Sequence, residues 1–299
     1  MRKVLFWIED WWAFGTIHHG LVKELYKKGI YSNFLDWNKS LTPQEWDLVL
    51  ETYDLVVTKT DLVPTLHAQL GIPLNRIVAV AHAEWDLLLT TKGQDAPEWY
   101  GELYAYGVVS PYLCERSSEL GIARTPSLVS LGVHFELFYR SPSLSLSTVG
   151  YAGAVTANDF WSRDIKRGHL VELAIPPEIK LKRHERYRWM CMPAYYSSVD
   201  AIAVSSTQEG AGLPSMEAAS AGRLVFSTPV GVFREHGPKG GGVTLPIEEE
   251  LLPICLREEL LRYHRDPEAY HSKCREIQEY ARENYDWSKH IDRWAEFLA

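Results

Sequence analysis

Two glutamates within residues 205–222, with two glycines between them, form the most informative pattern in the chain. The segment reads SSTQEGAGLPSMEAASAG, so Glu209 opens a glycine-containing loop and Glu217 lies about one turn into a helix that starts near Pro214. The backbone N–H groups and positive dipole end of a helix N-terminus bind phosphate, and two flanking carboxylates accept hydrogen bonds from sugar or ribose hydroxyls. The alternative interpretation is purely structural: Glu217 is a favourable first-turn acid and the glycines only make a turn.

Short β-branched runs alternate with amphipathic helical patterns along the chain, which is typical of βαβ units in parallel sheets. A Ser/Pro-rich, nearly uncharged stretch at 141–147 separates two such series and predicts a linker between domains. The segment 257–297 is almost wholly helical in pattern, with a break at 286–288. We therefore expect an α/β protein made of two Rossmann-like halves. The expected strands are 4–8, 55–58, 76–81, 106–110 and 127–131 in the first half, and 148–152, 178–181, 201–205, 224–227 and 242–245 in the second.

The composition is that of a globular protein. The chain has 299 residues, 46% of them hydrophobic and 23% charged, which suits two compact α/β domains. Its apolar runs fall far below the ~20 residues of a membrane-spanning helix, and Glu9 and Asp10 interrupt the only apolar stretch that resembles a signal peptide. The net charge of −8 argues against a general nucleic-acid binder, and four scattered cysteines lack the spacing of a zinc site. We expect a cytoplasmic protein without a metal site.

The two-glutamate motif resembles the E-x7-E motif of the retaining GT-B glycosyltransferases of family 4, with Glu209 and Glu217 matching the two acids. Four further landmarks of that family follow the same order along most of the chain. They are GVVS at 107–110, GVHFELF at 132–138, VGYAG at 149–153 and PAYYSSVD at 193–200.

The resemblance implies a GT-B fold, in which two Rossmann-like domains face each other across a cleft. The acceptor-binding domain is expected at 1–145, the nucleotide-sugar donor domain at 146–283, and a C-terminal helix at 284–299 that crosses back to the first domain.

The family also implies roles for individual residues. Glu217 should hold the nucleotide ribose, and Glu209 the hydroxyls of the donor sugar. The donor is further lined by Gly153 and by the backbone of Gly210, Ala211, Gly212 and Leu213.

Cations are needed on the leaving diphosphate, because negative charge develops there as the glycosidic bond breaks. Lys166 is the first candidate, Arg163 the second, and Arg167 is expected to bind the donor beside them. The position after Gly153, where the family usually has an arginine, is Ala154. The alternative for the three cations is a solvated basic helix start.

In the first half, His82 closes an apolar strand and matches a catalytic histidine of the family that faces the donor sugar; a hydrogen-bonded core histidine is the alternative. Gly15 stands where the family has a glycine-rich turn close to the diphosphate.

The resemblance implies transfer of a sugar from a UDP- or GDP-type donor to a hydroxyl acceptor, with retained anomeric configuration and with neither metal nor cofactor. The acceptor is expected in polysaccharide, lipopolysaccharide or glycoconjugate synthesis, as a glycan or a lipid-linked acceptor that brings the protein to the inner membrane face. One alternative is transfer to hydroxymethylated DNA bases, although no basic groove is evident in this acidic sequence. The other is a catalytically silent scaffold that binds sugar nucleotides.

Overall fold

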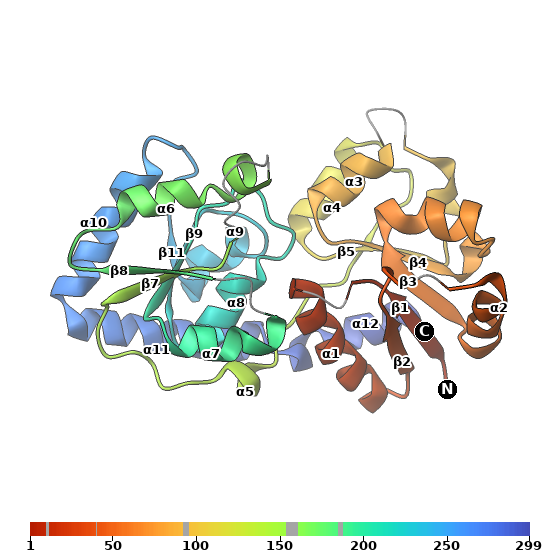
Figure 1. Ribbon diagram of the computed structural model, residues 1–299, viewed down its shortest axis with the longest axis horizontal. Helices are drawn as coiled ribbons and strands as arrows, with labels where there is room; N and C mark the ends of the chain where they lie inside the picture. Colours follow the sequence, from red (N-terminus) through yellow and green to blue (C-terminus); the bar gives the residue numbers. More distant parts are fainter. Residues whose placement is uncertain (10–11, 40, 92–95, 154–160, 185–187) are drawn as a thin grey trace. The chain divides into compact units, whose positions relative to one another are not determined.

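The computed structural model describes residues 1–9, 12–39, 41–91, 96–153, 161–184 and 188–299. The chain forms two compact units. The first consists of Met1–Gly132 together with Trp287–Ala299, and the second of Val133–Asp286. Each unit contains one parallel β-sheet with helices packed on it (Figure 1).

The first unit is built on a six-stranded parallel sheet with the order β2-β1-β3-β4-β5-β6. Every residue of β4 is buried, as expected for a central strand that is covered on both faces. The expected strands are confirmed, and one further strand, β2, was not expected. The bounds are β1 Lys3–Trp7, β2 Tyr31–Leu35, β3 Leu55–Lys59, β4 Ile77–Ala81, β5 Ala105–Val108 and β6 Ser127–Leu128.

Helices cover both faces of this sheet. Successive side chains of a strand point to opposite faces, and Phe6 meets Trp294 of α12 whereas Trp7 meets Trp46 of α2. The helices are α1 Trp12–Lys27, α2 Pro43–Thr52, α3 Glu84–Thr91, α4 Pro111–Glu119 and α12 Ile291–Leu298. Short helical turns lie at η1 Thr60–Leu62, η2 Thr65–Gln69, η3 Leu74–Arg76, η4 Glu98–Gly101 and η8 Trp287–Lys289.

The C-terminal segment is held on the first unit by Trp287, which is 1% exposed. Two glycines lie against its indole: a Cβ atom added to Gly20 would lie 2.3 Å from Nε1, and one added to Gly132 would lie 2.8 Å from Cδ2. The sequence predicts that the last helix returns to the first domain. In the structure, close contact between the indole of Trp287 and glycine backbone holds this segment on the first unit.

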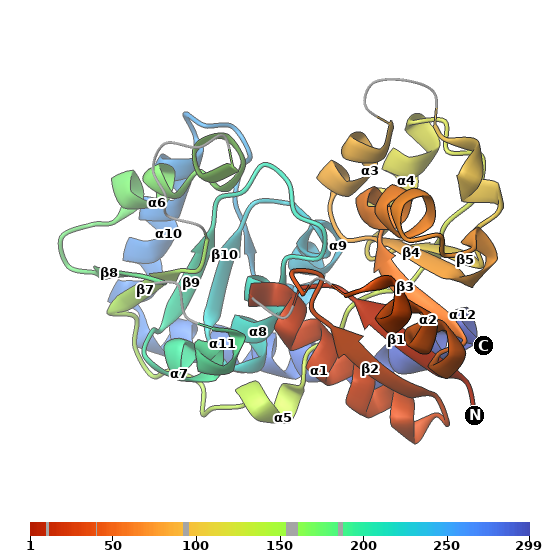
Figure 2. The same ribbon diagram turned by 45° about the vertical axis from the view of Figure 1, so that its right-hand side comes forward.

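The second unit has a five-stranded parallel sheet with the order β11-β10-β9-β7-β8. The helix α6 packs with α10 on one face, and α8 packs with α11 on the other (Figure 2). The strands are β7 Thr148–Tyr151, β8 Lys180–Arg183, β9 Ala201–Val204, β10 Leu224–Ser227 and β11 Val243–Thr244, each within two residues of its expected position. The helices are α5 Phe135–Phe138, α6 Gly168–Ala174, α7 Met192–Ser197, α8 Leu213–Ser220, α9 Phe233–His236, α10 Leu252–Arg265 and α11 Pro267–Asn284, with turns η5 Trp161–Lys166, η6 Trp189–Cys191 and η7 Gly237–Gly241.

The segment between the two series of strands belongs to the second unit from Val133 onward, so the domain boundary expected at 145/146 lies inside that unit. The backbone N–H of Val133 bonds to the carbonyl of Tyr285 at 2.8 Å, and Gln278 donates to the carbonyl of Arg140 at 2.7 Å. The Ser/Pro-rich stretch is tied down as well, because Ser147 donates to the carboxylate of Asp200 through both its backbone N–H and its hydroxyl. These bonds to distant residues anchor a stretch whose composition predicted a linker.

Candidate active site

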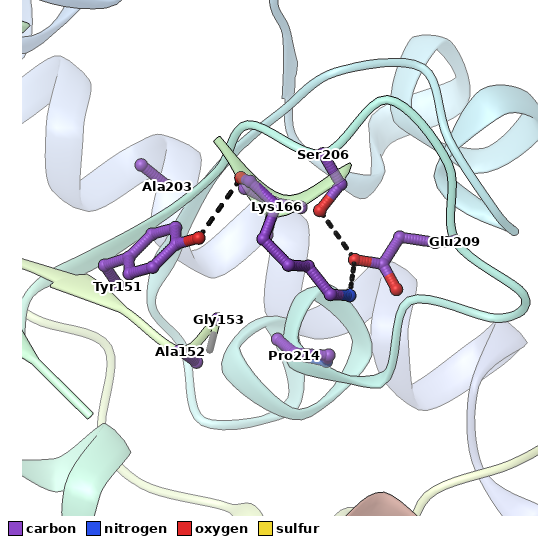
Figure 3. Close-up of a pocket in the computed structure, with 9 residues that line it drawn as sticks. Tyr151, Ala152, Gly153, Lys166, Ala203, Ser206, Glu209 and Pro214 are labelled. Atoms are coloured by element: carbon purple, nitrogen blue, oxygen red, sulfur yellow. Dashed lines mark hydrogen bonds and ion pairs between the residues drawn. The ribbon is translucent and has the colours of Figure 1, made fainter. Parts of the chain in front are cut away.

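A pocket lies at the carboxyl ends of β7 and β9 in the second unit. These two strands are neighbours at the point where the strand order reverses, and ligands of open α/β sheets bind in the crevice at such a switch point. The pocket is lined by Tyr151, Ala152, Gly153, Lys166, Ala203, Val204, Ser206, Glu209 and Pro214 (Figure 3).

The polar centre of this pocket is an ion pair. The ammonium of Lys166 lies 2.5 Å from Oε1 of Glu209, and the hydroxyl of Ser206 donates to the same oxygen at 2.7 Å (Figure 3). The lysine and glutamate side chains are only 16% and 14% exposed, so the pair is partly desolvated and its attraction is less screened than at the surface. A ligand that carries both a phosphate and hydroxyls can separate these two side chains. Its phosphate then binds Lys166, and one of its hydroxyls donates a hydrogen bond to Glu209.

Backbone bonds fix the position of Lys166. Its carbonyl accepts hydrogen bonds from the phenol of Tyr151 at 3.1 Å and from the hydroxyl of Ser205 at 2.7 Å. Tyr151 ends β7 and Ser205 follows β9, so the turn that carries Lys166 is attached to both strands of the switch point.

Arg167 points into the protein. Its side chain donates to the carbonyls of Ser205 and Ile247, each at 2.8 Å, and the residue is 5% exposed. Its backbone has a φ of +50°, which is unfavourable for a residue with a side chain. Arg167 therefore braces the wall behind Lys166 and does not line the pocket.

The loop before α8 is shaped by a left-handed glycine. Gly212 has a φ of +79° and precedes α8, with Pro214 in the first turn of the helix. The carbonyl of Ala211 accepts the N–H of Val232 at 3.0 Å, and a Cβ atom on Gly231 would lie 2.7 Å from the same oxygen. Gly210, Ala211, Gly212 and Leu213 are all buried, so close packing against 230–232 holds the loop that borders the pocket.

Glu217 lies deeper in the unit. It is 3% exposed and accepts a hydrogen bond of 2.9 Å from the phenol of Tyr196 on α7. The structure thus brings Glu209, Lys166 and Gly153 together in the pocket, whereas Glu217 lies along α8 between that helix and α7.

Two sequence candidates lie in the first unit. His82 follows β4 and packs edge-on against Phe14, with ring centroids 5.0 Å apart. Burial, followed by the charge of Lys59, lowers the pKa of His82 to about 3, so the ring is neutral at ordinary pH. Gly15 lies inside the first turn of α1 and not in a glycine turn, because the helix already starts at Trp12.

Ala154 and the side chain of Arg163 lie outside the described residues. Among the residues that are described, Tyr151 and Ser206 belong to the site although sequence reasoning did not single them out. Tyr151 is the penultimate residue of the expected strand 148–152, and Ser206 directly follows the expected strand 201–205. Their place at the carboxyl ends of these strands was the signal in the sequence that could have identified them.

Solved structures of other proteins resemble this chain over its whole length. HepE from Anabaena, in complex with UDP and glucose, has a TM-score of 0.72 at 14% identity, covering 100% of this chain and 99% of HepE. Sucrose-phosphate synthase from Thermosynechococcus elongatus has a TM-score of 0.69 at 14% identity, with 99% and 98% covered. The catalytic domain of starch synthase IV from Arabidopsis thaliana, bound to ADP and acarbose, has a TM-score of 0.67 at 12% identity, with 100% and 98% covered.

The fold is that of GT-B glycosyltransferases. The expected α/β class with two parallel sheets is confirmed. No protein-family model and no curated protein sequence matches the chain, and at these identities the likeness concerns the fold.

Two kinds of feature are absent from the residues that the structure describes. No group of three or more His, Cys, Asp or Glu side chains there is arranged to hold a metal ion. No helix in the same residues combines the length and the apolar character needed to cross a membrane.

Proposed function

We propose that this protein is a retaining glycosyltransferase that moves a sugar from a nucleotide-diphosphate sugar to a hydroxyl acceptor. The observation that carries the proposal is the Lys166–Glu209 pair in a pocket at the switch point of the second sheet. The fold supports it, because HepE, which shares this fold, has been crystallised with UDP and with UDP-glucose.

In the proposed reaction Lys166 leaves Glu209 and binds the diphosphate. Its positive charge then stabilises the negative charge that develops on the leaving group, and fixed charges of this kind supply much of the rate acceleration in many group-transfer enzymes. Glu209, still held by Ser206, accepts a hydroxyl of the donor sugar. Arg163 is the second proposed cation. The counter-charge comes from these side chains in this proposal, with no metal ion or cofactor.

The loop 210–213 and the first turn of α8 are proposed to line the sugar and diphosphate. Glu217 is proposed to bind the ribose, with its orientation set by the bond from Tyr196. No side-chain nucleophile is assigned: the acceptor hydroxyl attacks the face that the diphosphate leaves, and the diphosphate takes the acceptor proton. His82 is the proposed hydrogen-bonding partner of the sugar from the first unit.

The acceptor class proposed is a glycan, glycoconjugate or lipid-linked hydroxyl, handled in the cytoplasm or at the inner face of the membrane. The donor is proposed to be of the UDP or GDP type, and both nucleotides are therefore included in the test.

A thermal-shift panel of UDP, GDP, ADP and their sugar derivatives tests donor binding. A ligand that binds only the native state raises its stability according to its concentration over Kd. We expect a shift with one nucleotide and a larger shift with its sugar derivative. Lys166→Met should abolish both shifts, and Glu209→Gln should remove the additional shift of the sugar derivative. The control Lys273→Met, which removes a lysine paired on the surface of α11, should keep both. No shift with any nucleotide would overturn the donor-site assignment.

Turnover is then followed by NMR with the nucleotide sugar that binds. A product or hydrolysed sugar that first appears in the anomeric configuration of the donor supports retention, and the opposite anomer contradicts it. Binding without transfer to any glycan acceptor and without slow hydrolysis would indicate the silent scaffold instead.

A further inference from the structure

A second polar cluster lies in the first unit, at the carboxyl ends of β3 and β4. Lys59 is the last residue of β3, His82 follows β4, and Asp86 is the third residue of α3. The two strands are adjacent in the sheet, with Lys59 paired in register to Val80, so the cluster is assembled by the sheet itself.

Asp86 uses both carboxylate oxygens. Oδ1 lies 3.0 Å from the ammonium of Lys59, while Oδ2 accepts the backbone N–H groups of His82 at 2.8 Å and Ala83 at 3.0 Å. The residue is 3% exposed. Its carboxylate therefore bonds directly to the turn that carries the imidazole of His82.

The simplest explanation of Asp86 is helix capping. An acidic residue in the first turn that reaches back to the N–H groups before a helix is half of a capping box. Capping of α3 alone does not require a lysine from β3. The side chain of Lys59 is nevertheless close to Asp86 and only 15% exposed. Bringing an ammonium out of water is costly, so a partly buried ion pair is weak evidence for stability and fits a positional role.

The ammonium of Lys59 is itself held on three sides. Besides Asp86, it lies 3.3 Å from a carboxylate oxygen of Asp61 and 5.3 Å from the ring centre of Trp37. A charge fixed in this way sets the position of Asp86, and through it that of the His82 turn.

The imidazole of His82 lacks a partner for Nδ1 among the residues that the structure describes. The charged and titratable groups around it are Lys59 from β3, Asp86 from α3, Asp61 from η1 and His18 from α1. Of these, Lys59 acts on the ring directly, since its positive charge disfavours a second positive charge on His82.

We propose that Lys59 and Asp86 are positioning residues for His82: the ion pair fixes the turn on which the imidazole is presented to substrate. This inference rests on the role given to His82 in the proposed function. Lys59 has an additional electrostatic effect, because it helps to keep the ring neutral and therefore able to accept as well as donate a hydrogen bond.

The first test is a ¹³C-histidine NMR titration of the full chain, with His82 identified among the 11 histidines by the loss of its signal in His82→Gln. In the wild-type protein we expect His82 to titrate only near pH 3, so the titration is carried from pH 8 down to the acid limit of the folded protein. In Lys59→Met its pKa should rise by about one pH unit or more, because a nearby positive charge is lost and Asp86 stays. Lys59→Arg keeps the charge and should keep the low pKa.

The second test is amide hydrogen exchange at His82 and Ala83. Asp86→Ala removes the acceptor, and protection of both amides should fall by about tenfold or more. Asp86→Asn retains a carbonyl oxygen and should retain most of the protection. Lys27→Met, which removes an exposed lysine paired with Glu24 on α1, is the control for both measurements.

Equal His82 titrations in Lys59→Met and Lys59→Arg, or unchanged amide protection in Asp86→Ala, would overturn the positioning role. Both readouts need no substrate, so they stand if the nucleotide panel fails. Conversely, the protein could bind a nucleotide while the Lys59 variants leave the His82 pKa unchanged and the Asp86 variants leave amide protection unchanged. That result would overturn this inference and leave the proposed function in place.

Discussion

The phenol of Tyr196 donates a hydrogen bond of 2.9 Å to Oε2 of Glu217, where the two residues are 0% and 3% exposed. The bond joins α7 to α8, whose first turn borders the pocket. Burial, and then the charge of Glu217, raises the pKa of Tyr196 well above its ordinary value. The phenol therefore stays protonated, and able to donate this hydrogen bond, beyond the pH at which a solvated tyrosine ionises.

Tyr196→Phe should destabilise the protein by about 1.5–3 kcal/mol, because a buried carboxylate loses a charge-assisted bond. Urea unfolding measures the change. Tyr280→Phe removes a phenol bonded to His236, with no buried carboxylate involved, and should cost less. Equal losses in the two variants would show that the charge of Glu217 has no special effect.

Lys166 and Glu209 should be energetically coupled in the protein without ligand. Either Lys166→Met or Glu209→Gln alone breaks a partly buried ion pair, so each should cost about 1–2 kcal/mol. The double variant should cost less than the sum of the single variants. A double-mutant cycle from urea unfolding measures this, and simple additivity would mean that the pair does not interact.

Arg167 offers a direct measurement of backbone strain. Arg167→Ala and Arg167→Gly both remove the bonds to Ser205 and Ile247, so both should destabilise the protein. Since φ is +50° here, the glycine variant should be about 1 kcal/mol more stable than the alanine variant. Thermal unfolding of the two variants gives the difference, and an alanine variant as stable as the glycine one would contradict the strain.

Stability should fall on acidification below about pH 6.5. Burial lowers the pKa of His18 well below its ordinary value, and burial together with Lys59 lowers that of His82 to about 3. In that range the unfolded chain binds protons that the native protein excludes, so each histidine makes stability fall by about 1.4 kcal/mol per pH unit. Urea unfolding at pH 7, 6 and 5 should show a shallower slope in His18→Gln than in the wild-type protein, and an equal slope in the two would contradict the prediction.

Gly20→Ala should destabilise the first unit by about 1–3 kcal/mol, because its Cβ would lie 2.3 Å from Nε1 of Trp287. Gly101→Ala is the matched control, since no atom lies within 4 Å of the Cβ added there. Indole fluorescence followed during thermal unfolding reports the change in both variants.

The central strands could be predicted from the sequence because a strand buried on both faces reads as a continuous apolar run, as in β4 and β10. The edge strand β2, with the sequence YSNFL, has exposed residues at positions 31 and 33 and so gave no such run. The boundary was misplaced because Val133 and Ser147 are anchored by Tyr285 and Asp200, which lie far away in the sequence.

The candidate site could likewise be predicted only in part from the sequence. Glu209 and the glycine loop form a local pattern, and their place beside a sheet edge followed from it. The ion pair of Glu209 with Lys166 joins residues 43 positions apart, and that of Lys59 with Asp86 joins β3 to α3. Only the packing of strands in the sheet brings these partners together, and neither spacing nor composition records it.

The seating of Trp287 against Gly20 and Gly132 has a consequence for how the chain is made. The first unit contains residues from both ends of the sequence, with the whole second unit between them. During synthesis the surface of α1 that receives Trp287 and α12 emerges from the ribosome long before those residues exist. The second unit can therefore complete its core first, and the first unit closes only when the last helix has been translated.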